Sequence, residues 1–428
     1  MSRELGEHVG AHRPMTVAEK YYTFLDQAWP STAMISADLD RCFEPGEVRR
    51  AWEEFRTRRV LARTAATADL TLADVGTDQD VFRADVLPSA AWDRVFEEEG
   101  DRPCELGVPL RCHYLTSPDE GRSRVIFNGH HAVIDGRIGI GELQWFVRLL
   151  DGQQIPDQQL LSEPPAPTTH PWRESRSAMI ELLRELKARN ASYGPPQPTD
   201  WPDGSTPRRS WLRHLEIGPE TSARVVAEGR AHGANPFANV VSALLASSAN
   251  VLCGGDATLQ LAAPADLGAP PSDPGQAQAM AIAVLSRPFR VEVEDRWTLA
   301  AQVKAAITEA LQRGEGDLFF QLTRAESITD LAAGRDLIAA ALSAGPPSVV
   351  VSNMGVIESG SDPDWLRSLH GQLVAAPNQI VFLALTYYKG RLMHTFATDD
   401  NRVAPAQRDA LVAEYLARIG VEEETLRR

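Results

Sequence analysis

Apolar and polar residues follow two different periods along this chain, and the period changes from one segment to the next. Short apolar runs bounded by turn residues predict strands at 31–39, 109–115, 123–129, 210–217, 257–267 and 347–355, and a hairpin at 379–400 that turns at Lys389–Gly390. Apolar residues spaced three and four apart predict helices at 44–58, 137–152, 174–190, 219–233, 237–252, 298–314 and 404–419. Strands and helices therefore alternate, which predicts a mixed α/β fold.

A proline-rich stretch interrupts this alternation near the middle of the chain. Prolines recur through residues 153–207, on both sides of the helix predicted at 174–190. A chain of 428 residues is too long for one ordinary core, and about 150 residues per domain suggests two or three. We therefore expect two parts, residues 1–172 and 173–428, joined through the crossover at 153–207.

Composition and charge narrow the range of partners. The chain is 43% hydrophobic and 24% charged, which is typical of a soluble globular protein. Its formal net charge of -15 argues against broad binding to nucleic acid or to anionic membranes. The four cysteines form no Cys-x-x-Cys pair and no apolar signal segment is visible, so we expect a reducing, cytoplasmic location. Serines and asparagines interrupt the apolar segment 237–252, which predicts a buried helix rather than a membrane span.

The sequence HHAVIDG, residues 130–136, is the strongest candidate for chemistry. It connects the strand predicted at 123–129 to the following helix, a place where a strand delivers side chains to a cleft. Histidine exchanges protons near neutral pH, so His130 or His131 can serve as a general base. Asp135 follows His131 by four residues and can be fixed by the same turn, while Gly136 would supply the backbone freedom to bend into the helix.

Three interpretations of this segment remain open from the residues alone. It can be a polar turn with satisfied histidines, a metal site formed by His130, His131 and Asp135, or a catalytic loop with one histidine facing a cleft. Adjacent strand residues point to opposite faces, which argues against both histidines binding one metal ion. The motifs G-x-S-x-G, Walker A and G-x-G-x-x-G are all absent, so a lone base favours direct transfer over a serine nucleophile or a phosphate-binding loop.

HHAVIDG resembles the H-H-x-x-x-D-G signature of the thioester-dependent acyltransferase superfamily. That superfamily includes nonribosomal peptide condensation domains, chloramphenicol acetyltransferase, plant BAHD acyltransferases and stand-alone polyketide-associated acyltransferases. Three further segments agree in order: RRVLARTA at 58–65 is similar to the condensation motif R-H-x-x-L-R-T, LAAPADL at 261–267 to P-x-D-x-R, and SNMG at 352–355 to a strand end of stand-alone members. The resemblance extends over about residues 15–420.

The departures from these motifs point to one branch of the superfamily. Arg59 stands where the condensation motif has histidine, and Gly268 replaces the arginine that usually follows Asp266 by two positions. The D-F-G-W-G motif of the plant enzymes is missing. The resemblance is therefore greatest to stand-alone polyketide-associated acyltransferases.

The resemblance implies a fold and a set of residue roles. It implies two similar α/β lobes arranged in a V with a tunnel between them, the first lobe carrying the histidine motif. It implies that His131 is the base in the tunnel and that His130 and Gly136 support the loop. Asp135 would hold the loop through an ion pair, for which Arg63 is the partner by motif position. Ser352 and Asn353 end a buried strand and become candidates for stabilising an oxyanion or contacting substrate.

The function implied is acyl transfer from a thioester to a hydroxyl or amine of a small molecule, in specialised metabolism. No bound cofactor or metal is expected, because acyl-CoA or an acyl carrier protein acting in trans would supply the thioester as a co-substrate. RTRR at 56–59 and RRSWLR at 208–213 are candidate basic surfaces for that donor. Two alternatives stay open: a related fold recruited for another proton transfer, such as cyclisation or dehydration, and a non-catalytic binding protein of the same fold.

Overall fold

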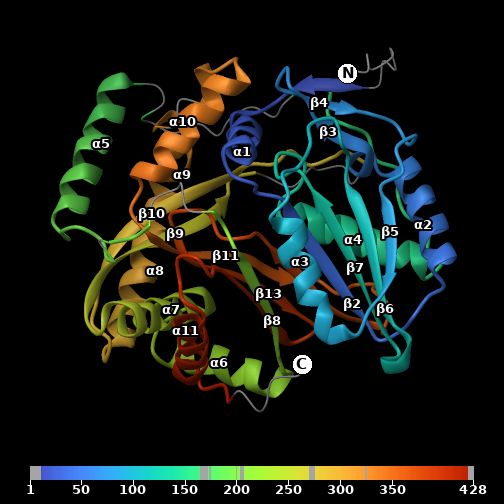
Figure 1. Ribbon diagram of the computed structural model, residues 1–428. Helices are drawn as coiled ribbons and strands as arrows, with labels where there is room; N and C mark the ends of the chain where they lie inside the picture. Colours follow the sequence, from blue (N-terminus) through green and yellow to red (C-terminus); the bar gives the residue numbers. More distant parts are fainter. Residues whose placement is uncertain are drawn as a thin grey trace.

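The computed structural model describes residues 11–163, 172, 175–198, 200–202, 207–268, 275–322 and 325–422, which form two lobes, each built on a β-sheet (Figure 1). The helices are α1 (Val17–Ala28), α2 (Pro45–Arg58), α3 (Trp92–Gly100), α4 (Gly136–Leu150), α5 (Arg176–Ala191), α6 (Pro219–Ala231), α7 (Pro236–Cys253), α8 (Arg296–Gln312), α9 (Glu315–Leu322), α10 (Leu331–Ala344) and α11 (Pro405–Arg418). The strands are β1 (His12–Pro14), β2 (Ala33–Leu39), β3 (Thr64–Ala66), β4 (Thr71–Asp74), β5 (Phe82–Val86), β6 (Arg111–Ser117), β7 (Arg122–Gly129), β8 (Ser210–Ile217), β9 (Ala257–Asp266), β10 (Ile282–Val291), β11 (Ser348–Ile357), β12 (Leu366–Gln372), β13 (Gln379–Tyr388) and β14 (Arg391–Asp399). The expected mixed α/β fold with two lobes is confirmed.

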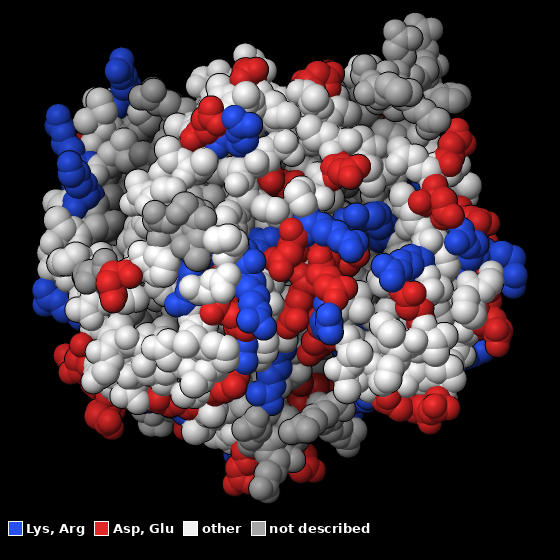
Figure 2. Space-filling view, in the orientation of Figure 1, with Lys and Arg blue, Asp and Glu red and all other residues white. Residues whose placement is uncertain are grey.

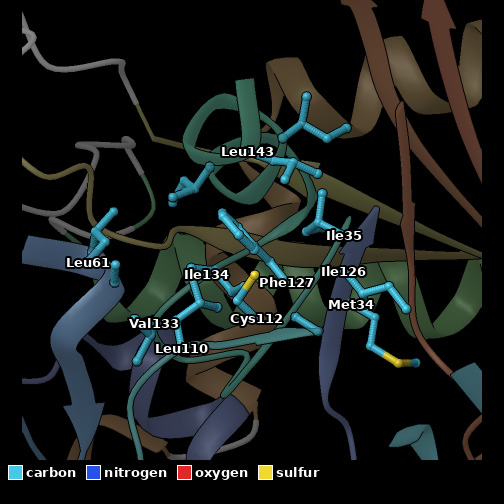
Figure 3. Close-up of a cluster of buried hydrophobic side chains, with 14 of the residues drawn as sticks. Met34, Ile35, Leu61, Leu110, Cys112, Ile126, Phe127, Val133, Ile134 and Leu143 are labelled. Atoms are coloured by element: carbon cyan, nitrogen blue, oxygen red, sulfur yellow. The ribbon is translucent and has the colours of Figure 1, made fainter. Parts of the chain in front are cut away.

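The sheet of the first lobe has the strand order β12-β2-β7-β6-β5. Ile35 on β2 lies opposite Phe127 on β7, and α4 covers that face of the sheet. Figure 3 shows side chains from β2, β6, β7 and α4 gathered in one cluster, among them Ile35, Cys112, Phe127 and Leu143. Each large apolar side chain buried in this way contributes about 1.5–3 kcal/mol. The packing holds the start of α4, and therefore the end of the HHAVIDG segment, against the sheet.

The sheet of the second lobe has the strand order β10-β9-β11-β13-β14-β8, with helices α6, α7, α8 and α11 packed together against it (Figure 1). The core is formed by buried valines and leucines of β11 and β13 together with the apolar side of α7. By length and composition α7 could cross a membrane, but 67% of it is buried inside the protein. That burial matches the interpretation of 237–252 as a core helix.

One strand of the first lobe's sheet comes from the second half of the chain. β12 pairs antiparallel with β2, so that Gly371 lies opposite Ile35. Because β12 follows β11 and precedes β13 in sequence, the chain leaves the second sheet, completes the first, and returns. The division of the chain at residue 172 stays a prediction. The sheet of the first lobe nevertheless takes one of its strands, β12, from the part of the chain beyond that residue.

The two lobes also meet where α3 packs against β8. Figure 2 shows acidic side chains gathered over α3 near the middle of this face, with basic side chains beside them. Arg208, just before β8, donates to Asp101 at the end of α3 over 2.6 Å, and His214 Nδ1 lies 2.6 Å from Asp93 Oδ1. These pairs connect the lobes on the side of the sheet opposite α4.

Two glycines of α4 provide a matched test of the packing between α4 and β2. A Cβ at Gly139 would lie 2.4 Å from Cγ1 of Ile35, whereas a Cβ at Gly141 would meet nothing within 4 Å. Gly139→Ala is expected to lower the free energy of unfolding by about 1–3 kcal/mol through overpacking. Gly141→Ala is expected to leave it unchanged or to raise it by up to about 1 kcal/mol, because alanine favours a helix interior. Urea unfolding of both variants measures the difference, and equal effects would contradict the close packing.

Candidate functional site

The loop between β7 and α4 places both histidines. β7 ends at Gly129, where a Cβ would lie 2.7 Å from Cδ1 of Leu110, so only glycine fits there without a shift. The chain then turns, with the Val133 N–H donating to the carbonyl of His130 over 2.8 Å. α4 begins six residues after the first histidine, at Gly136. The sequence therefore turns sharply from a buried strand into a helix, with His131 on the turn.

His131 is buried and stacked on an aromatic ring of the first helix. Its side chain lies against Tyr22 of α1, with the ring centroids 4.1 Å apart and the planes 24° from parallel. Burial lowers the pKa of His131 to about 4, although two backbone carbonyls, its own and that of Ile134, act in the opposite direction. The imidazole is therefore neutral at pH 7, which is the form that accepts a proton.

His130 is directed into the first lobe. Its Nδ1 accepts the Ala132 N–H over 3.1 Å, and its Nε2 lies 3.9 Å from Oδ2 of Asp26 on α1. Burial, followed by the neighbouring His131, lowers the pKa of His130 to about 3. These contacts fix the loop from inside, which fits a supporting residue rather than one that meets a substrate.

Asp135 caps the helix that follows it. Its Oδ1 accepts the N–H groups of Arg137 and Ile138 over 2.9 and 2.8 Å, while Oδ2 is buried without a hydrogen bond to any described residue. Burial raises the pKa of Asp135 to about 6; the Ile138 N–H opposes this rise and the carboxylate of Asp266 adds to it. Asp135 thus stabilises the start of α4 through the orphan N–H groups of the first turn.

The expected ion pair between Asp135 and Arg63 does not form. Arg63 donates from Nε to Asp74 over 2.8 Å and from Nη1 to the carbonyls of Arg56 and Thr57. Arg63 ends a short 3-10 turn immediately before β3, and β3 pairs with β4, which carries Asp74. The arginine is therefore satisfied by its own neighbourhood. It supports the end of α2, not the histidine loop.

Gly136 is required for space rather than for backbone freedom. Its φ is not positive, but a Cβ there would lie 2.7 Å from Sδ of Met354, at the end of β11. Gly371 on β12 has the same constraint, because its Cβ would lie 2.5 Å from that sulfur. The prediction about Gly136 is corrected accordingly: the glycine lets the second lobe approach the start of α4.

A cavity of about 80 Å³ lies between the two lobes beside His131. Its described wall is formed by Tyr22, Ala33, Ile35, His131, Asp135, Gly136, Arg137, Pro264, Asp266, Ile282, Ser352, Asn353, Met354, Gly371, Gln372, Leu373, Phe382 and Ala384. The structure therefore brings His131, Ser352 and Asn353 to one space, as the motifs implied. Asp135, which was expected to point away from substrate, also contributes to this wall. Asn353 Oδ1 accepts the Gly355 N–H over 3.0 Å, which leaves its amide N–H₂ group as a donor.

One ion pair crosses from lobe to lobe at this cavity. Arg137, on the first turn of α4, places Nη1 3.6 Å from Oδ2 of Asp266 at the end of β9. Both residues are on the cavity wall. Among the described residues, no three His, Cys, Asp or Glu side chains are arranged to hold a metal ion, so the metal interpretation of His130, His131 and Asp135 finds no support in their geometry.

The arginines proposed as a donor surface are largely engaged inside the protein. Arg59 is buried and binds Glu142 of α4 through two bonds of 2.9 and 2.6 Å. Arg56 is also buried and donates to the carbonyls of Gly76, Thr77 and Gln79. Arg208 forms the pair with Asp101 described above. RTRR is therefore mainly a structural segment that connects α2 to α4.

Sequence reasoning missed the contributions of α1 and of Met354. Tyr22 and Asp26 lie on α1, next to His131 and His130 respectively. A local signal for this helix exists: Thr16 accepts the Glu19 N–H, and the Glu19 carboxylate accepts the Thr16 N–H, which is a capping box of the type Thr-x-x-Glu. No comparable local signal marks Met354, because its neighbours in the fold come from distant segments.

Part of the chain matches a known protein family, and several solved structures have a similar fold. Residues 206–395 match the family described as phthiocerol/phthiodiolone dimycocerosyl transferase C-terminus. A comparison with curated protein sequences gave no match. Solved structures with the same fold include polyketide synthase associated protein 5 from Mycobacterium tuberculosis, with 14% identity, a TM-score of 0.61, and coverage of 95% of this chain and 97% of that one.

Domains of peptide synthetases share the fold as well. The first condensation domain of the CDA synthetase has 15% identity and a TM-score of 0.65, with 97% of this chain and 96% of that chain covered. The epimerization domain from the third module of tyrocidine synthetase B has 13% identity and a TM-score of 0.57, with 99% of each chain covered. These matches confirm the resemblance drawn from HHAVIDG: the chain has the fold of the condensation-domain-like superfamily.

Substitutions of Asp135 separate its capping role from a role of its charge. Asp135→Ala is expected to lower the free energy of unfolding by about 0.5–2 kcal/mol, because two N–H groups of α4 lose their acceptor. Asp135→Asn keeps the side-chain oxygen and is expected to remain close to the unsubstituted protein. Urea unfolding measures both values. If Asp135→Asn were as unstable as Asp135→Ala, the negative charge, and not the cap, would be what the fold needs.

Acid pH is expected to destabilise the protein before most carboxylates titrate. Burial lowers the pKa of four histidines to about 3 or 4: His130, His131, His370 and His394. Below their unfolded pKa of about 6.5 the unfolded chain binds more protons, so the free energy of unfolding falls as pH falls. Burial raises the pKa of Asp26 and Asp135 to about 6, which opposes this trend below pH 6 but involves two groups against four. Thermal melts at pH 7.5 and 5.5 should therefore give a lower Tm at pH 5.5; a constant or higher Tm would contradict neutral buried histidines.

Proposed function

We propose that this protein transfers an acyl group from a thioester to a hydroxyl or amine of a small molecule, with His131 as the general base. The observation that carries the proposal is the position of His131: neutral, stacked on Tyr22, and on the wall of a cavity between two lobes of condensation-domain-like fold. His130 is directed into the lobe and supports the loop. The family match of residues 206–395 to a transferase C-terminus supports the same reaction class.

The proposed reaction needs one base and no covalent intermediate. Nδ1 of His131 is buried and His131 lines the cavity, so we assign the role of base to Nε2. Nε2 takes the proton of the acceptor hydroxyl or amine as its oxygen or nitrogen attacks the thioester carbonyl. The new C–O or C–N bond forms, the C–S bond breaks, and the departing thiolate takes the proton from His131. Bringing the reacting groups of donor and acceptor together beside His131 supplies much of the remaining rate enhancement through proximity.

Ser352 and Asn353 are the proposed partners of the carbonyl oxygen. Both lie on the wall of the cavity that His131 shares. They were expected to end a strand, but β11 continues past them to Ile357, and they lie in its middle, just before its bulge. The Ser352 hydroxyl and the Asn353 amide are hydrogen-bond donors, and a donor aimed at the developing oxyanion lowers the barrier in a site that excludes water. Asn353 is held by its turn to Gly355, which restricts the directions in which its amide can point.

The donor is proposed to be acyl-CoA or an acyl carrier protein that acts in trans, with no cofactor held by the protein itself. Fold relatives include a polyketide synthase associated protein and condensation domains of synthetases, which supports a role in natural-product biosynthesis. We also propose a reducing, cytoplasmic location, which the four free cysteines support.

A second candidate rests on a specific comparison. The same fold occurs in an epimerization domain and in a cyclization-docking bidomain, so His131 could move a proton in a reaction that forms no new ester or amide. Such an enzyme would keep its dependence on His131 but leave an alcohol or amine acceptor unmodified. A non-catalytic binding protein would show neither dependence. Mass analysis of the products therefore separates the three.

The test is a screen of acyl-CoA and acyl-carrier donors against alcohols and amines, read by the mass of the acylated product. With the best pair, His131→Ala is expected to lower kcat/KM by about 100- to 10,000-fold, because general-base catalysis is lost. His232→Ala, which removes an exposed histidine stacked on Trp297 in the second lobe, serves as the matched control and should retain full activity. A folded His131→Ala variant with unchanged turnover would rule out this role.

A further inference from the structure

A bulge in β11 turns one methionine into the cavity. β11 pairs in parallel with β13 up to Asn353, and the register then shifts before Val356. Within the bulge, Gly355 has a φ of +77°, a left-handed conformation that favours glycine. Met354 lies at this point and is only 5% exposed, although Asn353 before it and Val356 after it are exposed. Bulges of this kind redirect a side chain next to a functional site.

Met354 is held by segments from both lobes. Its Sδ occupies the space beside Gly136, at the start of α4, and beside Gly371, on β12. The hydroxyl of Thr386 on β13 donates to the same sulfur over 3.8 Å. Because each of the two glycines would clash with this sulfur if it carried a Cβ, the position of the methionine is set by the backbone on two sides. Met354 is therefore packed between the two lobes at the cavity wall.

The cavity wall carries polar and apolar side chains together. His131, Ser352 and Asn353 are the polar residues assigned to the proposed chemistry. The apolar residues of the wall are Ile35, Ile282, Met354, Leu373, Phe382 and Ala384. An apolar wall suits the hydrocarbon part of a thioester, while the pantetheine arm and a hydroxyl or amine acceptor need polar surroundings.

The cavity itself is small. A water molecule needs roughly 10–15 Å³ of such space, so the cavity of about 80 Å³ holds roughly five to eight water-sized groups. That is enough for a thioester carbonyl with a few methylenes. Met354 lies between Gly136 and Gly371 on the wall of this space.

We propose that Met354 forms the end wall of an acyl pocket and limits the length of the straight acyl chain that the donor can carry. This inference rests on the proposed acyl transfer at His131 and adds the residue that selects the acyl group. Shortening Met354 opens the pocket toward Gly136 and Gly371 while the side chains of His131, Ser352 and Asn353 are kept. Enlarging it closes the pocket near the carbonyl. The residue is proposed to set specificity, and it takes no part in moving the proton.

The activity test uses the full-length protein and a series of N-acetylcysteamine thioesters with straight acyl chains of increasing length. The unsubstituted protein should have one preferred chain length and lose roughly tenfold or more in kcat/KM for each further methylene that does not fit. Met354→Ala should move the optimum to longer chains, and Met354→Phe should reduce turnover of all but the shortest. Met354→Leu, which keeps the volume, should retain the original profile. An unchanged profile in both Met354→Ala and Met354→Phe would overturn the proposal.

The control is Met393→Ala on β14. Met393 is also a buried methionine of the same hydrophobic cluster, 1% exposed, but it is not on the cavity wall. This variant should lose stability in the way that any buried methionine does, yet keep the chain-length preference of the unsubstituted protein. A shift of preference in Met393→Ala equal to that in Met354→Ala would show that general loosening of the fold, and not the end wall, causes the effect.

A binding measurement separates this inference from the proposed reaction. Straight-chain carboxylates of increasing length are added to the same variants, and the rise in Tm is measured without any turnover. Met354→Ala should be stabilised by longer chains than the unsubstituted protein. If no thioester is turned over but this shift is present, the acyl-transfer proposal fails and the pocket stands. If acyl transfer occurs and the shift is absent from both binding and turnover, the pocket proposal fails; a change in acceptor preference instead of chain length also overturns it.

Discussion

The close approach of Met354 to Gly136 and Gly371 is the constraint on which the geometry of the site depends. The sulfur lies 2.7 Å from the place where Gly136 would carry a Cβ and 2.5 Å from that of Gly371, so the two glycines together make room for the methionine between β11, β12 and the start of α4. β12, which carries Gly371, completes the sheet of the first lobe beside β2. The second half of the chain thus contributes a strand to one lobe and a wall to the cavity in the same short stretch.

Desolvation has a consistent effect on the chemistry of this site. Burial lowers the pKa of His131 and raises the pKa of Asp135, so it favours the uncharged form of each. Oδ2 of Asp135 fits this picture, because it is buried without a hydrogen bond to any described residue, and such burial disfavours the charged carboxylate. The loop is held by helix capping, by the stacking of Tyr22 and by packing. These contacts hold the loop without an ion pair between Asp135 and Arg63. Another arginine of the RRVLARTA segment, Arg59, holds α4 by binding Glu142.

The elements with strong local signals were predictable from the sequence. α2 begins at Pro45 and the hairpin turns at Lys389–Gly390, because proline at a helix start and glycine in a tight turn act within a few residues. β12 was not predicted, since its partner β2 is distant in sequence and its small, polar residues carry no clear alternation. The partner of Asp135 was also missed. A carboxylate before a helix can be satisfied by local N–H groups as well as by a remote arginine, and motif position does not distinguish the two.

The reason for a glycine at position 136 could not be inferred from the motif alone. Its place in HHAVIDG suggested flexibility, but its φ is ordinary, and the constraint comes from a methionine more than two hundred residues away in the chain. A motif therefore describes residues that are neighbours in the sequence, whereas a residue within it can be required because of packing between the lobes. By the same logic, the histidine loop points to a reaction type, whereas the proposed chain length is set by Met354 and the apolar residues around it. A relative with the same loop and a smaller residue at this position of β11 would keep the reaction and accept a longer chain.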